Sequence, residues 1–246
     1  VRDVLDRSTQ PAQDVPLLPA DRLDQLSADV DLLLAEADAV AAKERIVTLP
    51  GSVSTTSMLG LAEDEAKFAR ELARPMPRQP SPAARFGTRF HAWVEAHYGQ
   101  QVLLDPAELP GQGDVDLNSD AELEEVIQMF SDGEYGQRSP HAIEAPFSIV
   151  LAGQQVIGRI DAIFTTTLAD GRTGFEVVDW KTNKKPTADP LQLSVYRLAW
   201  AELNGIPPED VTGAFYYVRL GTTVRYGPDD LLDRPALEAL LSGAGA

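Results

Sequence analysis

Two aspartates and a lysine are spaced so that they could bind a divalent cation. Val177 to Thr182 are predicted to form a strand, because they are rich in β-branched and aromatic residues and Asn183 ends the run. Asp179 and Lys181 are two residues apart and therefore point to the same face of that strand. An ion pair in an apolar strand carries a large desolvation cost, which favours a functional role. A bare Asp-x-Lys triplet is, however, most often a surface ion pair worth about 0–1 kcal/mol.

A second acid in register strengthens the functional interpretation. Gly158 to Phe164 is another predicted strand, with Asp161 as its single acid, and Asp170-Gly171 between the two strands is a strong hairpin-turn signal. Asp161 lies nine residues before Asp170, and Asp179 lies nine after it. In an antiparallel hairpin centred there, the two carboxylates should face each other, with Cα atoms about 5 Å apart.

Facing carboxylates of this kind suit Mg²⁺ or Mn²⁺, which take oxygen ligands, and the backbone carbonyl of Trp180 could add another. Such an ion can activate water and polarise a phosphoryl oxygen, while Lys181 could offset the charge that develops on the phosphate. We therefore expect phosphodiester hydrolysis rather than glycoside hydrolysis, because a lysine beside the acids does not favour the raised pKa of a glycosidase acid.

The composition bounds the class of protein. With 246 residues, 43% of them hydrophobic, the chain can bury one full core and carry an N-terminal appendage. The absence of cysteine excludes disulfides, cysteine-ligated zinc and iron–sulfur clusters, and it fits a reducing compartment. No apolar run approaches about 18 residues and no signal peptide begins the sequence, so we expect a soluble, cytoplasmic protein without a membrane partner.

The net charge of −17 argues weakly against a nucleic-acid partner, but the basic residues are not evenly spread. Several of them fall in or beside the stretches that carry the candidate chemistry: Arg85, Arg89, Arg159, Lys181, Lys184, Lys185 and Arg197. An acidic body with a locally basic cleft is compatible with DNA.

The N-terminal third is predicted to be an appendage followed by helices. Residues 1–50 form an arm with an acidic amphipathic helix over 23–45, ended by Leu49-Pro50-Gly51, and residues 51–246 form the main domain. A helix capped by Ser54 or Thr55 should run to about residue 73. The proline-rich stretch 74–82 should be a stiff linker.

Further helices and strands flank the predicted hairpin. A helix over 83–98 carries two histidines, and the sequence by itself does not choose between His91 and His97 as a functional group. After a loop at 105–116, Ser119 and Glu122 form a capping box that should open a helix through residue 130. Strands at 143–151 and 154–165 should form a hairpin, with Glu144 as a third acid near the sheet; a solvated strand-edge glutamate is an equally good interpretation.

A basic loop, a helix and another strand follow the central strand. The loop at 183–186 contains Lys184, and Asp189 and Pro190 should begin a helix that ends at Asn204-Gly205. Gln192 and Tyr196 share one side of this helix, where they could belong to an ordinary surface or line the same cleft as the Asp-x-Lys strand. A strand at 211–218 can then return parallel to the central strand, and a short helix should occupy the tail. The predicted fold class is α/β (or α+β), a mixed sheet flanked by helices.

Four motifs in order resemble the RecB-like branch of the PD-(D/E)xK nucleases. They are Phe86-Gly87-Thr88-Arg89-Phe90-His91, Gly158-Arg159-Ile160-Asp161, Asp179-Trp180-Lys181-Thr182 and Gln192-x-x-x-Tyr196, within a match that spans roughly 54–218. The proline-rich linker and its surroundings are similar to the C-terminal nuclease domain of the actinobacterial UvrD-like helicase–nucleases of the AdnAB type.

The resemblance implies a restriction-endonuclease-like core and specific roles. It makes His91, Asp161 and Asp179 metal ligands and Lys181 the catalytic lysine, which is what selects His91 among the histidines. It assigns supporting or DNA-binding roles to Gln192 and Tyr196, and less firmly to Glu144; Arg159 and Lys184 are candidate DNA contacts beside these motifs.

The same resemblance implies a partner and a cellular role. These are a strand of single-stranded or unwound DNA, a helicase motor in the same polypeptide, a second helicase–nuclease subunit, and double-strand break repair in the bacterial nucleoid. The iron–sulfur cluster of some relatives is absent, and the sequence has no phosphate-binding Gly-x-x-x-x-Gly-Lys-Ser/Thr loop. Two alternatives stay open: a catalytically silent scaffold that guides DNA or holds subunits together, and a hydrolase of another phosphodiester.

Overall fold

A computed structural model describes residues 20–41, 47–76, 79–99 and 117–243. The chain divides into two compact units, Val1–Ile46 and Val47–Ala246. In the first unit the described part is the helix α2 (Ala20–Ala41), which begins three residues before the amphipathic helix predicted over 23–45; the last residues of that prediction, 42–45, lie outside the described residues. The domain boundary predicted near residue 50 stays a prediction, and the loop predicted at 105–116 lies outside the described residues.

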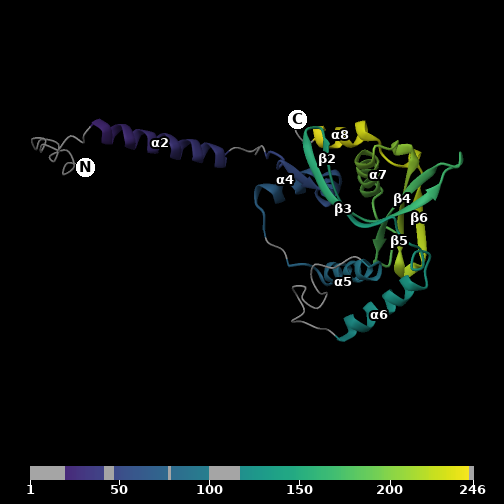
Figure 1. Ribbon diagram of the computed structural model, residues 1–246. Coiled ribbons are helices and arrows are strands. Elements are labelled where there is room, and N and C mark those ends of the chain that lie inside the picture. The colour runs from purple at the N-terminus through teal and green to yellow at the C-terminus, as the bar shows by residue number, and fades with distance from the viewer. Residues whose placement is uncertain (1–19, 42–46, 77–78, 100–116, 244–246) are drawn as a thin grey trace, which may run out of the picture. The chain divides into compact units, whose positions relative to one another are not determined.

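The second unit alternates helices and strands (Figure 1). Its strands are β1 (Ser52–Ser54), β2 (Ala142–Leu151), β3 (Gln154–Thr167), β4 (Thr173–Lys181), β5 (Val211–Tyr217) and β6 (Thr222–Tyr226). Its α-helices are α3 (Thr55–Glu63), α4 (Glu65–Ala73), α5 (Pro82–His97), α6 (Leu117–Ser131), α7 (Leu191–Asn204) and α8 (Arg234–Gly243). Three short 3-10 helices complete it: η3 (Pro208–Asp210), η4 (Val218–Leu220) and η5 (Pro228–Asp230).

The strands form one mixed sheet in the order β1-β3-β4-β5-β6, with β2 paired to β3. The pairs β2–β3, β3–β4 and β5–β6 are antiparallel, whereas β1–β3 and β4–β5 are parallel. The predicted three-strand meander and the parallel return of β5 beside β4 are therefore confirmed. The α/β fold class, a mixed sheet flanked by helices, is confirmed as well.

Helices cover both faces of the sheet. Because successive side chains of a strand point to opposite faces, neighbouring residues enter different hydrophobic cores. Val177 belongs to the core under α7, together with α3 and α8, while Val178 belongs to the core under α5 and α6. In the second core Phe130 is fully buried and meets the rings of Phe90 and Trp180 at centroid distances of 5.7 and 5.2 Å. The sheet is therefore held rigidly from both sides, which fixes the position of the residues at its edges.

The hairpin between β3 and β4 forms as the turn chemistry predicts. Gly171 has a φ of 82°, its amide donates to the carbonyl of Leu168, and the amide of Arg172 donates to the Asp170 carboxylate at 3.0 Å. Only glycine adopts such a φ without strain, which is why Asp-Gly specifies this turn. The β2–β3 hairpin turns at Ala152 and Gly153, also as expected.

Three predicted elements differ from the structure. The single helix expected up to residue 73 is broken at Asp64, whose φ is −156° and whose side chain accepts from the Lys67 amide to cap α4. The helix expected to open at the Ser119 capping box begins at Leu117, so Ser119 lies inside α6. The short strand β1 was not predicted, because three residues are too few to produce a periodic pattern.

The start of α7 differs by one residue. Pro190 lies at the N-cap position rather than inside the first turn, and the Asp189 carboxylate accepts from the Leu191 amide at 2.8 Å. Asp189 therefore still satisfies a free amide at the helix start, as predicted. The described parts of the proline-rich stretch, 74–76 and 79–81, have no regular structure.

The turn after α6 depends on a glycine. A Cβ on Gly136 would lie 2.4 Å from the carbonyl oxygen of Phe130 and 2.5 Å from that of Ser131, both of them backbone atoms that cannot move alone. We expect Gly136→Ala to lower the free energy of unfolding by about 1–3 kcal/mol, as overpacking usually does. Urea denaturation measures the change. Gly51→Ala is the matched control, because nothing lies within 4 Å of its Cβ position; equal midpoints for the two variants would contradict the prediction.

Among the described residues, no helix combines the length and the apolar character needed to cross a membrane.

Candidate active site

Asp161 and Asp179 lie where the β3–β4 ladder ends. Pairing continues to Ala162 and Val178, so the two aspartates occupy the next positions of the same register. The backbones of the two aspartates are therefore placed opposite each other, as expected. Their side chains have different partners: Asp161 accepts a hydrogen bond from the Trp180 amide at 2.9 Å, whereas Asp179 contacts Lys181 and Gln192.

Glu144 lies on the other side of Asp161. The β2–β3 ladder pairs Ile143 with Ala162 and Ala145 with Ile160, which leaves Glu144 and Asp161 opposite each other between these pairs. Glu144 has a φ of 45°, an uncommon value for a residue with a side chain. Strained backbone of this kind persists where the surrounding structure imposes it, and it is frequent at functional sites. The interpretation of Glu144 as a freely solvated strand-edge residue is wrong, because its side chain is 16% exposed.

The imidazole of His91 completes a group of three possible metal ligands. His91 Nδ1 lies 3.6 Å from Glu144 Oε1 and 3.6 Å from Asp161 Oδ2. One ligand atom from each residue lies within 4.8 Å of the others, close enough to hold one ion. The group is assembled from α5, β2 and β3.

The structure also separates the two histidines of α5. The ring of His97 stacks on Trp93 with centroids 4.9 Å apart and lies 6.3 Å from Phe130, and its Nε2 is 3.3 Å from the Gly136 carbonyl. His97 therefore belongs to the aromatic packing between α5 and α6. His91 is the histidine that reaches the acids.

Asp179 is engaged with Lys181 and Gln192. Lys181 Nζ lies 2.6 Å from Asp179 Oδ2 and donates to Gln192 Oε1 at 2.9 Å. The Gln192 amide donates to Asp179 Oδ1 at 2.6 Å and to the Tyr196 hydroxyl at 2.8 Å. Tyr196 is 5% exposed, so the ordinary-surface interpretation of this side of α7 is wrong for it. The four side chains form one network, which holds the ammonium of Lys181 in a single position.

Burial and like charge perturb the acids strongly. Burial and the nearby carboxylate of Asp179 raise the pKa of Asp161 to about 7, although the imidazole of His91 opposes the shift. Burial also raises the pKa of Asp179, against the effect of Lys181. Burial lowers the pKa of His91, but the carboxylates of Asp161 and Glu144 outweigh it and raise that pKa to about 9. Titratable groups with strongly shifted pKa values that gather in one place make this cluster the candidate functional site.

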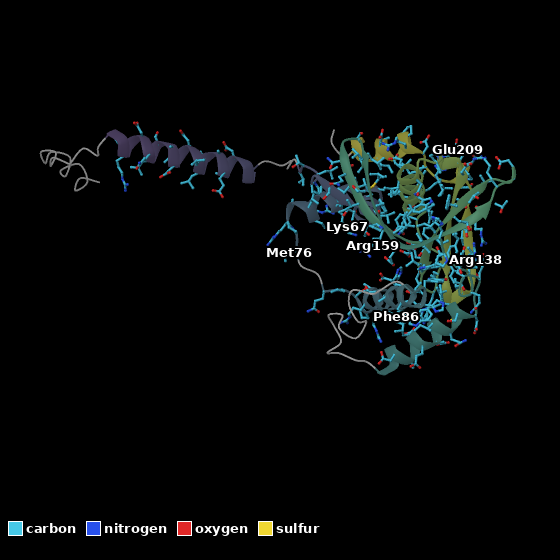
Figure 2. All side chains as sticks on the ribbon, viewed as in Figure 1. Lys67, Met76, Phe86, Arg138, Arg159 and Glu209 are labelled. Carbon is cyan, nitrogen blue, oxygen red and sulfur yellow. The ribbon has the colours of Figure 1, made fainter. Side chains whose placement is uncertain are left out.

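Two predicted site residues lie outside this group. Lys184 has an 80% exposed side chain whose ammonium is 4.0 Å from Glu122 of α6. Arg159 is exposed on β3, two residues before Asp161 (Figure 2). Trp180 contributes its amide to Asp161, and its ring is buried in the core under α5 and α6. A role of the Trp180 carbonyl as a metal ligand stays a prediction.

Phe215 is a site residue that the sequence analysis did not identify. It lies opposite Asp179 in the β4–β5 pairing, and the ammonium of Lys181 is 5.2 Å from the centre of its ring. A cation over an aromatic face is stabilised by the ring quadrupole. The predicted parallel strand at 211–218 already indicated that some of its residues lie beside those of the central strand. Which residue lies beside Asp179 could not be predicted, because no tight turn joins parallel strands and fixes their register.

The three-ligand group can be tested directly by metal titration. We expect Glu144→Gln to weaken Mn²⁺ binding about 10–100-fold, because the amide keeps the volume but loses the charge and one good oxygen ligand. Isothermal titration calorimetry measures the affinity. Glu63→Gln, on an exposed position at the end of α3, is the matched control and should bind as the unsubstituted chain does. Unchanged affinity in Glu144→Gln would remove this residue from the ligand set.

Comparisons with known proteins show which family and which solved structures this chain is similar to. Residues 61–241 match the family described as the PD-(D/E)XK nuclease superfamily. A crystal structure of a candidate exonuclease from Eubacterium rectale is similar in fold, with a TM-score of 0.50 and 13% sequence identity over 79% of this chain and 77% of that one. The crystal structure of SSO0001 matches with a TM-score of 0.33 and 13% identity over 81% of this chain and 77% of that chain. A search of curated protein sequences gives no match.

Proposed function

The chain belongs to the PD-(D/E)XK nuclease superfamily, and we propose that it acts as a DNA exonuclease domain dependent on Mg²⁺ or Mn²⁺. The observation that carries the proposal is the convergence of His91, Glu144 and Asp161 beside the Asp179–Lys181 pair. An isolated Asp-x-Lys triplet could be a surface ion pair, but one whose aspartate is 2% exposed, next to three further titratable groups, is better explained by chemistry.

The residues present fit a hard divalent cation. Glu144 and Asp161 offer carboxylate oxygens and His91 offers a nitrogen, all within reach of one ion. Burial disfavours the ionised form of the Asp161 carboxyl group, which is why its pKa is raised. A bound cation would stabilise the ionised form. When bound, the ion would activate a water and polarise the phosphoryl oxygen. We propose that Asp179, the next position of the ladder, joins the ligands on the side facing Lys181.

Lys181 would stabilise the negative charge that develops on the phosphate. Its ammonium is held by Asp179 and by Gln192 Oε1, so it needs no reorganisation during the reaction. Gln192 in turn is held by the hydroxyl of Tyr196. We propose that Arg159 contacts the DNA backbone, because its guanidinium is exposed on the strand that carries Asp161.

We further propose that an ATP-dependent helicase motor in the same polypeptide feeds a DNA strand to this site during double-strand break repair. The resemblance of its motifs to the helicase–nucleases of the AdnAB type supports this context, as well as a second helicase–nuclease subunit and an association with the nucleoid. The sequence contains no phosphate-binding loop for ATP, so such a motor would have to lie outside these 246 residues.

Degradation of end-labelled single-stranded DNA by this chain tests the nuclease proposal. We expect products only with Mg²⁺ or Mn²⁺, none with a chelator, and none from Asp179→Ala at equal concentration. An exonuclease should leave circular single-stranded DNA intact. Equal background hydrolysis by the chain and by Asp179→Ala would favour the silent scaffold. In a competition experiment, inhibition of the hydrolysis by a different phosphodiester but not by unlabelled DNA would favour another substrate. Acceleration by ATP should require a polypeptide that includes the motor.

A further inference from the structure

The side chain of Arg219 contacts three other parts of the nuclease unit beside the candidate active site. Arg219 lies in η4, directly after β5, and its side chain is 13% exposed. Its Nε donates to the carbonyl oxygen of Thr182 at 2.6 Å, and its Nη1 lies 2.9 Å from Glu122 Oε1 of α6. Its Cζ lies 4.7 Å from the ring centre of Phe86, which belongs to α5 (Figure 2). One guanidinium group therefore connects η4 with α5, with α6 and with the residue that follows β4.

The bond to Thr182 fixes the chain next to Lys181. The register of β4 and β5 runs up to the pair of Lys181 with Tyr217, and Thr182 is the next residue. Segments at the ends of secondary-structure elements open more readily than those at the centres. The bond from Arg219 continues the connection between the two chains by one residue, so the backbone of Lys181 is held on both sides of its own position.

The contact with Phe86 fixes the helix that carries His91. Phe86 and His91 lie five residues apart on α5, so a shift of the first also shifts the second. The same helix lies against Thr182, because a Cβ on Gly87 would be 3.9 Å from Thr182 Oγ1. The buried residues of α5 belong to the apolar core on that face of the sheet, and apolar contacts are non-directional. Arg219 adds a directional contact to them.

Arginine suits this position because of the shape of its side chain. The guanidinium group is planar, presents its N–H donors in fixed directions and stacks on aromatic faces. It can therefore bond the Thr182 carbonyl, pair with the Glu122 carboxylate and lie over the Phe86 ring at the same time. The ammonium group of a lysine is a point charge and could not serve all three partners.

We propose that Arg219 is a positioning residue of the nuclease reaction, which holds the end of β4 and the helix α5 in one arrangement. These two elements carry Lys181 and His91, which act on the same phosphodiester in the proposed mechanism. A misplacement of about 1 Å at such a site can cost about 10²-fold in rate. The inference rests on the proposed function, because it concerns the same reaction.

Arg219→Met tests the proposal, because methionine keeps an apolar stem and lacks every N–H donor. In hydrolysis of end-labelled single-stranded DNA at saturating Mn²⁺, we expect kcat to fall about 10–100-fold while KM stays within about threefold. A raised KM with an unchanged kcat would overturn the proposal and would assign Arg219 to a DNA contact. Unchanged values of both constants would overturn it as well.

Arg219→Lys separates the position of the side chain from its charge. Lysine keeps the ion pair with Glu122 and the charge that a DNA backbone would recognise, but it cannot also bond the Thr182 carbonyl and cover Phe86. We expect kcat to remain at least about fivefold below that of the unsubstituted chain. Full kcat in this variant would show that the charge alone suffices, which would overturn the proposal.

Arg234→Met is the matched control for the loss of an arginine that joins several elements. Arg234 donates to the Val150 carbonyl of β2 at 2.9 Å and pairs with Glu202 of α7, so it ties α8 to both. Its loss should lower the midpoint of urea denaturation but leave kcat and KM unchanged. Equal falls of kcat in the two variants would reduce Arg219 to a stabilising role and would overturn the proposal.

Hydrogen exchange of the metal-free chain, followed by mass spectrometry, gives a readout that does not need activity. Arg219→Met should speed exchange at least about fivefold in peptides that cover the end of β4 and the first turns of α5, whereas Arg234→Met should not. Unchanged exchange in these peptides would overturn the positioning role. Absence of hydrolysis by the unsubstituted chain would instead overturn the proposed function, and the exchange rates would still test what Arg219 holds in place.

Discussion

Asp161→Asn should reduce metal-dependent DNA hydrolysis by at least about 10³-fold in kcat/KM. The asparagine side-chain oxygen can still accept from the Trp180 amide, so the local backbone should keep its position. What is lost is the charge that Asp161 brings to the three-ligand group with His91 and Glu144. Hydrolysis of labelled single-stranded DNA at saturating Mn²⁺ measures the effect.

The same substitution should make the metal-free chain more stable. Asp161 is buried beside Asp179, and its raised pKa means that the fold disfavours its charged form. Removing that charge removes a desolvation cost and a repulsion, so thermal unfolding at pH 8 in a chelator should shift to higher temperature. Asp170→Asn, at the exposed hairpin turn, is the matched control for activity. Activity within tenfold of the unsubstituted chain in Asp161→Asn would refute its place in the site.

Lys181→Met should lower both activity and stability. Without its ammonium, Asp179 is left 2% exposed with no cation in contact, and breaking a buried pair in this way costs about 3 kcal/mol. Gln192 would retain its bond to Asp179 and limit the loss. The rate of DNA hydrolysis should fall about 10²–10⁴-fold, as expected when a positioned charge is removed from a site of phosphoryl chemistry. Chemical denaturation and single-turnover hydrolysis measure the two effects separately.

A double variant separates the structural from the chemical role of Lys181. Lys181→Met with Asp179→Asn removes both charges, so the stability should recover while the activity should not. If Lys181 acted only by holding Asp179, Lys181→Arg would keep full activity through the same ion pair. We expect this variant to keep the stability of the unsubstituted chain but less than a tenth of its rate of hydrolysis. The reason is that the larger guanidinium cannot occupy the position of Nζ between Asp179 and Gln192. Full activity in Lys181→Arg would limit the residue to positioning.

Local signals predicted the hairpin that carries the two aspartates. Asp-Gly turns and alternating strand residues act over a few residues, so counting outward from Asp170 placed Asp161 and Asp179 in register, as the ladder to Ala162 and Val178 confirms. The same counting around Ala152-Gly153 would have placed Glu144 opposite Asp161. It would not have revealed the positive φ of Glu144, because that conformation is imposed by the surrounding sheet.

Other elements were beyond local reasoning. The break at Asp64 separates two helices whose apolar residues continue the same general pattern, so the sequence looks like one helix, although an aspartate three residues before Lys67 is a possible cap. The strand β1 exists because β3 offers it an edge. No property of three residues predicts pairing with a strand about a hundred positions away.

The sequence by itself determined which strands form the central hairpin, where its turns lie, and that two aspartates and a lysine meet at one end of it. The residue pattern alone did not choose between His91 and His97; the family resemblance selected His91, and the tertiary structure placed its imidazole beside Glu144 and Asp161. Only the tertiary structure showed that Asp179 contacts Lys181 and Gln192. The reason is physical. Turn type and strand alternation are properties of neighbouring residues, whereas the approach of α5 and α7 to the sheet depends on how two cores pack across its faces.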